Sequence, residues 1–286
     1  MIATITGEQW SAAREALRAS TKRFAELICS CDSRSMATGD WSVADTAAHV
    51  SAIALWDTAL VQSGDVPLPY PWNLEEEQIR NTTVDTVDRL NDRVLERFTE
   101  RDPQILAKQL SGHVDDMLRV TADLDPDKPV AWLGGAHVPL TGIFAHLTNE
   151  LQIHGRDIAR VAGARWLIPS PYAAQFLALF VGGLGRHGIG AVLDREGPAL
   201  RRRIAVRLVS RYMEPLTLVA LPGGPAVTGG PDSAVDVTVR IEPAAFNLMM
   251  FGRISRLRAV LTGKVAVSGP RPWLLPAFLR VVRFPS

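Results

Sequence analysis

One stretch of this sequence carries ionisable side chains on a face where an amphipathic helix normally buries apolar ones. Between Pro139 and Gly163, residues at alternating spacings of four and three share one helical face, and three consecutive members of that face are Glu150, His154 and Asp157. Burial of a carboxylate costs several kcal/mol unless it is paired or bound to a cation. A Glu and a His at i and i+4 can reach one divalent metal ion; a buried, hydrogen-bonded Glu–His–Asp network without a ligand is the alternative. This segment alone leaves both open.

A third ligand is available from a second expected helix. Ser42 and Asp45 form a Ser-x-x-Asp capping box, the pattern that begins a helix, and His49 lies on the apolar seam that follows. Two histidines and one carboxylate, with water in the fourth position, are typical of a catalytic zinc rather than a structural one, although non-haem iron uses the same residue types. The remaining histidines are expected beside the ligands or in the core (His146), on a solvated face (His113) and in loops (His137, His187).

Length and composition exclude several classes of protein. The chain has 286 residues, with 31 Lys and Arg against 30 Asp and Glu, and this balance argues against a broad electrostatic footprint for nucleic acid. We expect no secretory leader, because the mixed residues 1–10 show no basic start followed by an apolar run. We also expect no membrane span, because prolines and glycines interrupt the longest uncharged stretch, 167–185. Cys29 and Cys31 are expected to be free thiols in a reducing cytoplasm. We therefore expect a cytoplasmic monomer or homodimer with neither nucleic-acid nor membrane partners.

The hydrophobic pattern predicts an α+β protein in two domains. Residues 1–165 are expected to form an antiparallel four-helix bundle, and residues 166–286 a small α+β domain. The expected helices of the first domain are 6–31, 42–62, 74–99, 103–122 and 139–161. The expected strands of the second domain are 201–208, 215–221, 234–241 and 264–267, with helices at 243–251 and 273–282.

Segments in both predicted domains give the chain a family resemblance. Trp41-Ser-Val-Ala-Asp-Thr-Ala-Ala-His49-Val and Glu150-Leu-Gln-Ile-His154-Gly-Arg-Asp157 resemble the mycothiol-dependent maleylpyruvate isomerases, which are DinB-like four-helix-bundle metalloproteins of actinobacteria. Segments 234–239, 251–255 and 261–269 are similar to the sterol-carrier-protein-like C-terminal domain often fused to these bundles. The chain departs from the family in its greater length, with an apolar helix expected between 171 and 193 and a basic run at 201–203.

The resemblance implies roles for individual residues. It implies a zinc ion held by three ligands, namely His49, Glu150 and His154. It also implies a role for Asp157, which would orient His154 or hold the groups around a substrate thiol. Arg80, at the start of the helix that follows a Pro-rich loop, is expected to bind a substrate carboxylate, and Arg253 and Lys264 are further candidates.

The function expected from these residues is thiol chemistry at zinc. A low-molecular-weight thiol, mycothiol according to the resemblance, would replace the metal's water, and zinc would lower the thiol's pKa so that a thiolate exists at neutral pH. The thiolate would add to a small electrophile, giving cis–trans isomerisation if the thiol is expelled again and S-transfer if it stays. The alternative is a protein that binds a lipid or another hydrophobic small molecule and holds its metal for structure. Hydrolysis by zinc-bound hydroxide ranks last, because the sequence positions no separate general base for it.

Overall fold

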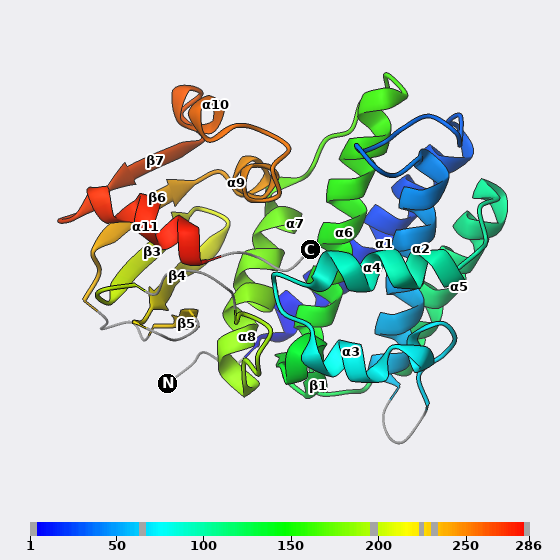
Figure 1. Cartoon of the computed structure of the whole chain (residues 1–286), viewed down its shortest axis with the longest axis horizontal. Helices are drawn as coiled ribbons and strands as arrows, with labels where there is room; N and C mark the ends of the chain where they lie inside the picture. The colour runs from blue at the N-terminus through cyan, green and yellow to red at the C-terminus, as the bar shows by residue number, and fades with distance from the viewer. Residues whose placement is uncertain (1–4, 63–66, 195–199, 223–225, 230–233, 283–286) are drawn as a thin grey trace.

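The computed structural model places a helical bundle beside a five-stranded sheet (Figure 1). It describes residues 5–62, 67–194, 200–222, 226–229 and 234–282. The bundle lies on the right in Figure 1 and the sheet on the left. This arrangement confirms the predicted α+β class, a helical bundle followed by a smaller α+β region. Within the described residues, no helix has the length and apolar character needed to cross a membrane.

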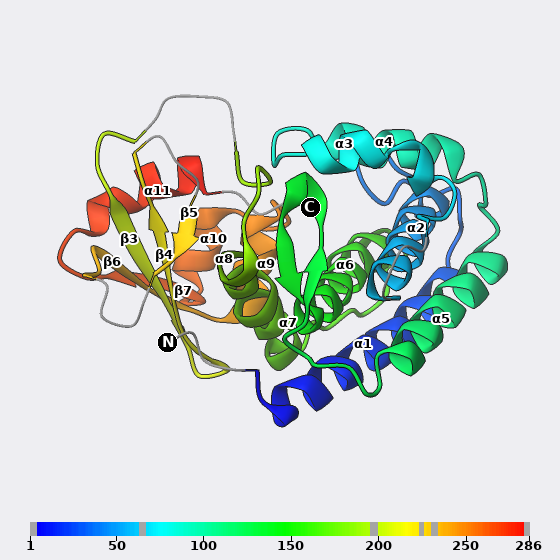
Figure 2. The ribbon, with the colours of Figure 1, turned by 90° about the horizontal axis from the view of Figure 1, so that it is seen from below.

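The long helices of the bundle are α1 (Gly7–Cys29), α2 (Val43–Val61), α5 (Pro103–Val120) and α6 (Leu140–Val161). α1 and α2 each pack against both α5 and α6. Side chains such as Phe24, Leu110 and Phe144 are fully buried where these helices meet. Nearly every residue of α6 is buried, because it also packs against the segment that leads to the sheet. α6 is therefore the central helix of the molecule, as Figure 2 shows.

The starts of the bundle helices are set by their capping residues. Thr6 and Ser42 each form a reciprocal capping box with the residue three positions later, and Asp102 accepts hydrogen bonds from the first turn of α5. Asp45, the carboxylate partner of Ser42 in the second box, also accepts a hydrogen bond of 2.7 Å from Arg101. The helix starts read from the sequence are confirmed to within a residue or two, and the start of α2 fixes where His49 faces.

The prediction of one helix over 74–99 is wrong. The structure has three shorter elements there: a 3-10 turn η1 (Trp72–Leu74), α3 (Glu76–Asn81) and α4 (Val87–Arg97). Thr82 donates to the Gln78 carbonyl at 2.6 Å, and the Thr86 hydroxyl accepts from the N–H of Thr83 at 3.0 Å. Such local side-chain bonds compete with helical ones and end the helix. The break lets α4 lie across α2 (Figures 1 and 2). Side chains of α4 line the cleft described below.

A short hairpin before α6 was not expected from the sequence. Its strands, β1 (Pro129–Ala131) and β2 (His137–Pro139), pair antiparallel. The connection contains Gly134 at φ 64°, where a Cβ would lie 2.5 Å from the Thr82 carbonyl oxygen, so the position requires glycine. β2 runs directly into α6 at Leu140, so the hairpin fixes where α6 begins.

The sheet has the strand order β5-β4-β3-β6-β7, with β3 and β6 parallel and the other neighbours antiparallel. The strands are β3 (Ile204–Ser210), β4 (Met213–Ala220), β5 (Ala226–Thr228), β6 (Val237–Ile241) and β7 (Val265–Ser268). The helices of this region are α9 (Pro243–Met250), α10 (Arg256–Leu261) and α11 (Leu275–Val281), with a 3-10 turn η4 (Pro272–Leu274) before α11. The predicted strands are found within a few residues of their expected bounds, and β5 was missed.

Asp236, which precedes β6, forms hydrogen bonds with two neighbouring segments. Its carboxylate accepts hydrogen bonds from the Ala205 N–H at 2.9 Å and from Arg271 at 2.7 Å. Burial would raise the pKa of Asp236, but these two contacts hold it below its ordinary value. The ionised carboxylate therefore ties β6 to both β3 and the segment after β7.

A helical stretch connects the bundle to the sheet. It consists of α7 (Ser170–Gln175), a π-helical turn η3 (Phe176–Val181) and α8 (Gly182–His187), and corresponds to the apolar helix expected between 171 and 193. It packs against α6 on one side and against α9 and β4 on the other. Because this stretch contacts both parts of the molecule, the division into domains 1–165 and 166–286 stays a prediction.

A candidate metal centre between two bundle helices

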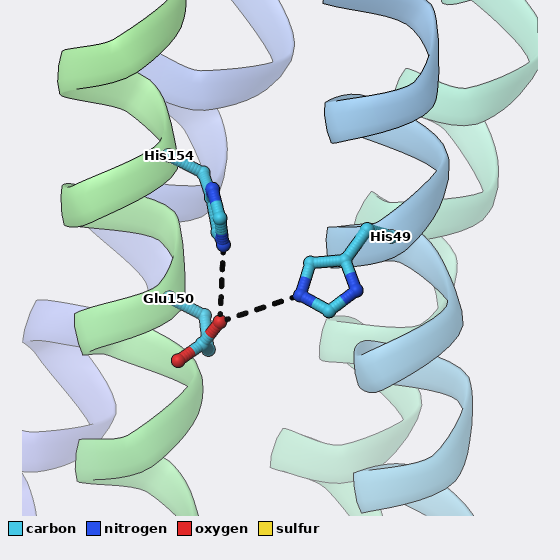
Figure 3. Close-up of side chains that lie close together, drawn as sticks. All are labelled: His49, Glu150 and His154. Atoms are coloured by element: carbon cyan, nitrogen blue, oxygen red, sulfur yellow. Dashed lines mark ion pairs between the residues drawn. The ribbon is translucent and has the colours of Figure 1, made fainter. Parts of the chain in front are cut away.

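Two bundle helices bring His49, Glu150 and His154 together (Figure 3). His49 comes from α2, and Glu150 and His154 lie one turn apart on α6. All three point into the space between the helices, and their ligand atoms lie within 4.8 Å of one another. The structure thus assembles the side chains that helical spacing placed on the inner faces.

The spacing of these side chains suits a shared cation better than a hydrogen-bonded network. Nε2 of His154 lies 3.4 Å and Nε2 of His49 lies 3.7 Å from the same Glu150 oxygen. Both distances exceed the roughly 2.7–3.2 Å of an N–H···O hydrogen bond. Ligands at about 2.0–2.1 Å from a tetrahedral zinc lie about 3.3 Å from one another. Two imidazole nitrogens and one carboxylate oxygen therefore suit such an ion in their chemistry; both nitrogen–oxygen separations are near this value, and all three atoms lie within 4.8 Å of one another.

Burial and mutual contacts set the protonation of the cluster. Burial would raise the pKa of Glu150, but contacts with His154 and His49 hold it well below its usual range, so the carboxylate is ionised. Burial lowers the pKa of His49, which favours the neutral imidazole that can donate a lone pair. For His154, the effect of burial is outweighed by Asp157 and Glu150, which raise its pKa. A proton on His154 and a cation in the cluster are alternatives, because a metal ligand must be deprotonated.

Asp157 supports the cluster and links it to the sheet region. Its carboxylate lies 3.5 Å from Nδ1 of His154, on the side of the ring away from Glu150. It also accepts bidentate hydrogen bonds from Arg253, from Nη2 at 2.6 Å and from Nε at 3.1 Å. Burial would raise the pKa of Asp157, but His154 and Arg253 lower it, so the group is ionised. The orienting role expected for Asp157 stays a prediction, because at this separation Nδ1 of His154 has no hydrogen-bond partner among the described residues.

Besides Glu150, a second buried carboxylate, that of Asp57, lies near the cluster on the side of His146. His146, one turn before Glu150 on α6, has Nε2 at 3.8 Å from Glu150 and Nδ1 at 3.6 Å from Asp57 of α2. Asp57 is fully buried, and among the described residues its oxygens have no hydrogen-bond partner. Sequence reasoning placed His146 beside the ligands or in the core, which is where it lies. It missed Asp57, although its spacing of eight residues from His49 puts it on the same face of α2.

An open cleft of about 970 Å³ leads to the three candidate ligands. Trp41 tilts against the His49 ring with centroids 4.7 Å apart, and α4 contributes polar side chains to the wall, namely Asp88, Asn91 and Asp92. A neighbouring cleft of about 750 Å³ shares Phe251 and Arg253 with the first and is lined by further arginines, Arg156 and Arg160. The combined cleft therefore has a carboxylate- and amide-lined wall and an arginine-lined wall, with the candidate ligands beside them. The α4 wall was missed because residues 74–99 were taken as one helix.

Several residues singled out in the sequence lie elsewhere. Arg80 is exposed on α3 and does not line either cleft, whereas Arg253 lines both. Lys264 is exposed before β7, away from the cleft. The expectations for the remaining histidines were partly wrong: His137 belongs to β2 and His187 ends α8, where it pairs with Asp127 at 3.2 Å, and His113 is half-buried.

Comparisons with known proteins place the chain in a family. The chain resembles the crystal structure of a mycothiol-dependent maleylpyruvate isomerase, at 16% identity over 90% of this chain and 91% of that one with a TM-score of 0.49, and a mutant of that enzyme at 15% and 0.48. A part that makes up 33% of the chain resembles the structure of sterol carrier protein 2 from Yarrowia lipolytica in its apo form. This match covers 87% of that protein, at 16% identity and a TM-score of 0.23. No curated protein sequence matches. The sequence profile called mycothiol maleylpyruvate isomerase N-terminal domain matches residues 9–159, more than half of the chain, and the chain therefore belongs to that family.

Proposed function

We propose that this protein is a mycothiol-dependent enzyme of the maleylpyruvate isomerase type, with a divalent metal, zinc, held by His49, Glu150 and His154. Membership of the family supports the thiol and the reaction class. The proposal of a metal rests on the distances of 3.4 and 3.7 Å between the histidine nitrogens and one Glu150 oxygen. These distances are too long for hydrogen bonds and close to the separation of zinc ligands. When bound, the cation would lower the pKa of the thiol, so that a thiolate is available at neutral pH.

The side chains around the cleft have complementary roles in this proposal. Asp157 lies 3.5 Å from Nδ1 of His154, from where it would orient the ring once the metal is bound, and it holds Arg253 at the edge of the cleft through hydrogen bonds. The arginine-lined wall, formed by Arg253 with Arg156 and Arg160, offers guanidinium groups to a carboxylate of the electrophile. This assigns to Arg253 the carboxylate-binding role expected of Arg80.

The proposed reaction needs no external oxidant or reductant. A new S–C bond forms at one alkene carbon of a conjugated electrophile, and the π electrons move onto its carbonyl. Rotation about the resulting single bond is followed by return of the electrons and cleavage of the S–C bond, which releases the trans isomer and the thiolate. If a proton instead traps the adduct, the thiol stays attached and the outcome is S-transfer.

A second candidate function is favoured by an apolar cavity in the sheet region. Side chains of the sheet, α9 and α11 line a pocket without polar groups, with Val206, Val239, Phe246 and Phe278 among them. Such a cavity suits a hydrophobic small molecule or lipid chain, with the metal of the bundle serving structure. Extraction and mass spectrometry of protein purified from cells would reveal such a ligand.

Metal analysis and thiol binding test the main proposal. Protein purified without chelator should contain about one zinc or comparable divalent ion per chain, and His49→Ala should lose it while remaining folded. Mycothiol should raise the melting temperature of the metal-loaded protein more than glutathione or bacillithiol does. Full metal retention in His49→Ala would refute the ligand assignment. Lipid in the purified protein without thiol-dependent turnover would favour the second candidate.

A further inference from the structure

α10 exposes large apolar side chains and buries a small one. Leu257, Val260 and Leu261 are 68%, 50% and 76% exposed, whereas Ala259 is fully buried. At spacings of three and four residues, the three exposed side chains share one face of the helix. An ordinary surface helix has the reverse pattern, with its large apolar face toward the core. Nothing in the described part of the chain covers this face of α10.

The same part of the sequence is strongly basic. Residues 243–286 contain no Asp or Glu and seven Lys or Arg, although the whole chain carries a net charge of only +1. Arg256, Arg258 and Lys264 flank the apolar face of α10 and are exposed. No carboxylate of the described residues forms an ion pair with these three, in contrast to Arg253 and Arg271. The exposed apolar face is therefore bordered by uncompensated positive charge.

The surface continues along the edge of the sheet that lies away from the bundle. β7 is an edge strand that follows α10, and Val267 on it is 40% exposed. Trp273 follows in η4 and is 69% exposed. In Figure 1, α10 and β7 lie on the far side of α9 from the bundle. The edge surface, defined as the exposed side chains of 256–273, is thus accessible to a large partner.

We propose that the edge surface binds peripherally to a bilayer that contains anionic phospholipid. Interleaved arginines and lysine would attract the negative headgroups, while Leu257, Val260 and Leu261 enter the boundary between headgroups and acyl chains. Trp273 is of the residue type enriched at that boundary. Protruding single side chains suit a deformable phase, whereas a folded partner protein requires a matching groove for each. Nucleic acid would use the cations but gains little from exposed leucines.

This inference is independent of the proposed metal chemistry, but it has a consequence for it. α10 begins three residues after Arg253, so the edge surface is adjacent in the chain to the arginine-lined wall of the cleft. Binding at α10 would bring that wall near the membrane. Peripheral binding needs no spanning helix, and so it is compatible with the finding that the described helices do not span a membrane. It replaces the expectation that the protein has no membrane partner.

Vesicle co-sedimentation of the full chain tests the proposal. The protein should sediment with vesicles of phosphatidylcholine and phosphatidylglycerol, and not with phosphatidylcholine alone, and added salt should release it. The double variant Leu257→Glu/Leu261→Glu should bind at least about tenfold more weakly, because two inserted apolar groups become negative charges. Leu74→Glu makes the same change at a residue that is 56% exposed on the bundle side, and it should bind like the wild type.

Other outcomes would overturn the proposal. Equal binding by wild type and the double variant would show that the apolar face is not used. Binding to soluble DNA or an acidic protein with none to anionic vesicles would identify a different polyanion as the partner.

Two controls accompany the vesicle experiment. Circular dichroism of the double variant should match that of the wild type, since both leucines are exposed. Glu150→Gln should bind vesicles normally, so that failure of the metal proposal remains separate from failure of this one.

Discussion

Replacing Glu150 with glutamine should abolish most metal-dependent stabilisation and leave the metal-free fold intact. Glutamine keeps the volume of the side chain but offers a neutral oxygen in place of the carboxylate that lies 3.4 Å from His154 and 3.7 Å from His49. We expect the apolar core of the bundle to hold the fold without this carboxylate, although three histidines contact it. The variant therefore separates the role of the metal from the stability of the protein.

The size of the effect follows from ligand linkage. With free zinc at a thousand times its Kd, binding stabilises the native state by about 4 kcal/mol. A chain of 286 residues has an unfolding entropy of about 0.6 kcal/mol per kelvin, so zinc should raise the melting temperature of the wild type by about 7 °C. An affinity about a hundredfold weaker leaves about 1.4 kcal/mol, or about 2 °C, at the same zinc concentration.

Differential scanning calorimetry with zinc and with chelator measures both effects. In chelator, Glu150→Gln should melt below the wild type, because a buried carboxylate that contacts three histidines is lost, so the quantity compared is the rise in melting temperature that zinc causes in each protein. Glu75→Gln is a matched control. Glu75 is 2% exposed and pairs with Arg93 and Arg97 outside the cluster, so its loss should lower the melting temperature equally with zinc and with chelator.

Two outcomes would refute this reasoning. If zinc raises the melting temperature of Glu150→Gln as much as that of the wild type, Glu150 is not a ligand. If chelator unfolds the wild type and Glu150→Gln melts like that metal-free form, the metal supports the fold and the catalytic proposal fails.

Other changes test the parts around the cluster. Asp157→Asn should retain the metal but lower kcat/KM for thiol-dependent turnover by about 10–100-fold, as loss of a group that orients a ligand does; unchanged kcat/KM would exclude the orienting role. Because the pKa of Asp236 is lowered in the folded state, its carboxylate stabilises the fold above the unfolded-state pKa of about 4, and this stabilisation is lost as the pH falls through the lower folded-state pKa. Asp236→Asn should therefore lower the free energy of unfolding at neutral pH by about 1–3 kcal/mol. Urea titrations at several pH values should show that its stability depends less on acid than that of the wild type. Gly155→Ala should destabilise by about 1–3 kcal/mol in the same titrations, because the added Cβ would lie 2.2 Å from the Trp166 ring; wild-type stability would show that the ring moves aside freely.

The inner faces of α2 and α6 were predictable because helical periodicity is a local property. His49, Glu150 and His154 each stand where an apolar residue would complete a buried seam, and the capping box at Ser42 fixes the register of α2. The strong β-branched alternation around Val237 likewise revealed β6. These signals depend on neighbours within one or two turns or along a single strand.

The contacts that complete the site depend on residues far apart in the chain. Arg253 meets Asp157 across 96 positions, and no local pattern in either segment specifies that pairing. Arg80 and Arg253 are both arginines near expected element ends, and only the packing of the sheet region on α6 distinguishes them. The break at Thr82–Thr86 was missed because threonine is tolerated in helices when its hydroxyl has no better partner. β1, β2 and β5 have three residues each, too few for alternation to stand out.

The arrangement of chemistry on α6 has a consequence for how this protein can vary during evolution. His146, Glu150, His154 and Asp157 depend on one uninterrupted helical register, and most residues between them are buried on other faces of the same helix. A single inserted or deleted codon within α6 would turn every later side chain by about 100° around the axis. It would misplace functional groups and core residues together. Length polymorphism among descendants of this gene should therefore fall in the connections, such as 121–128, while α6 keeps its length.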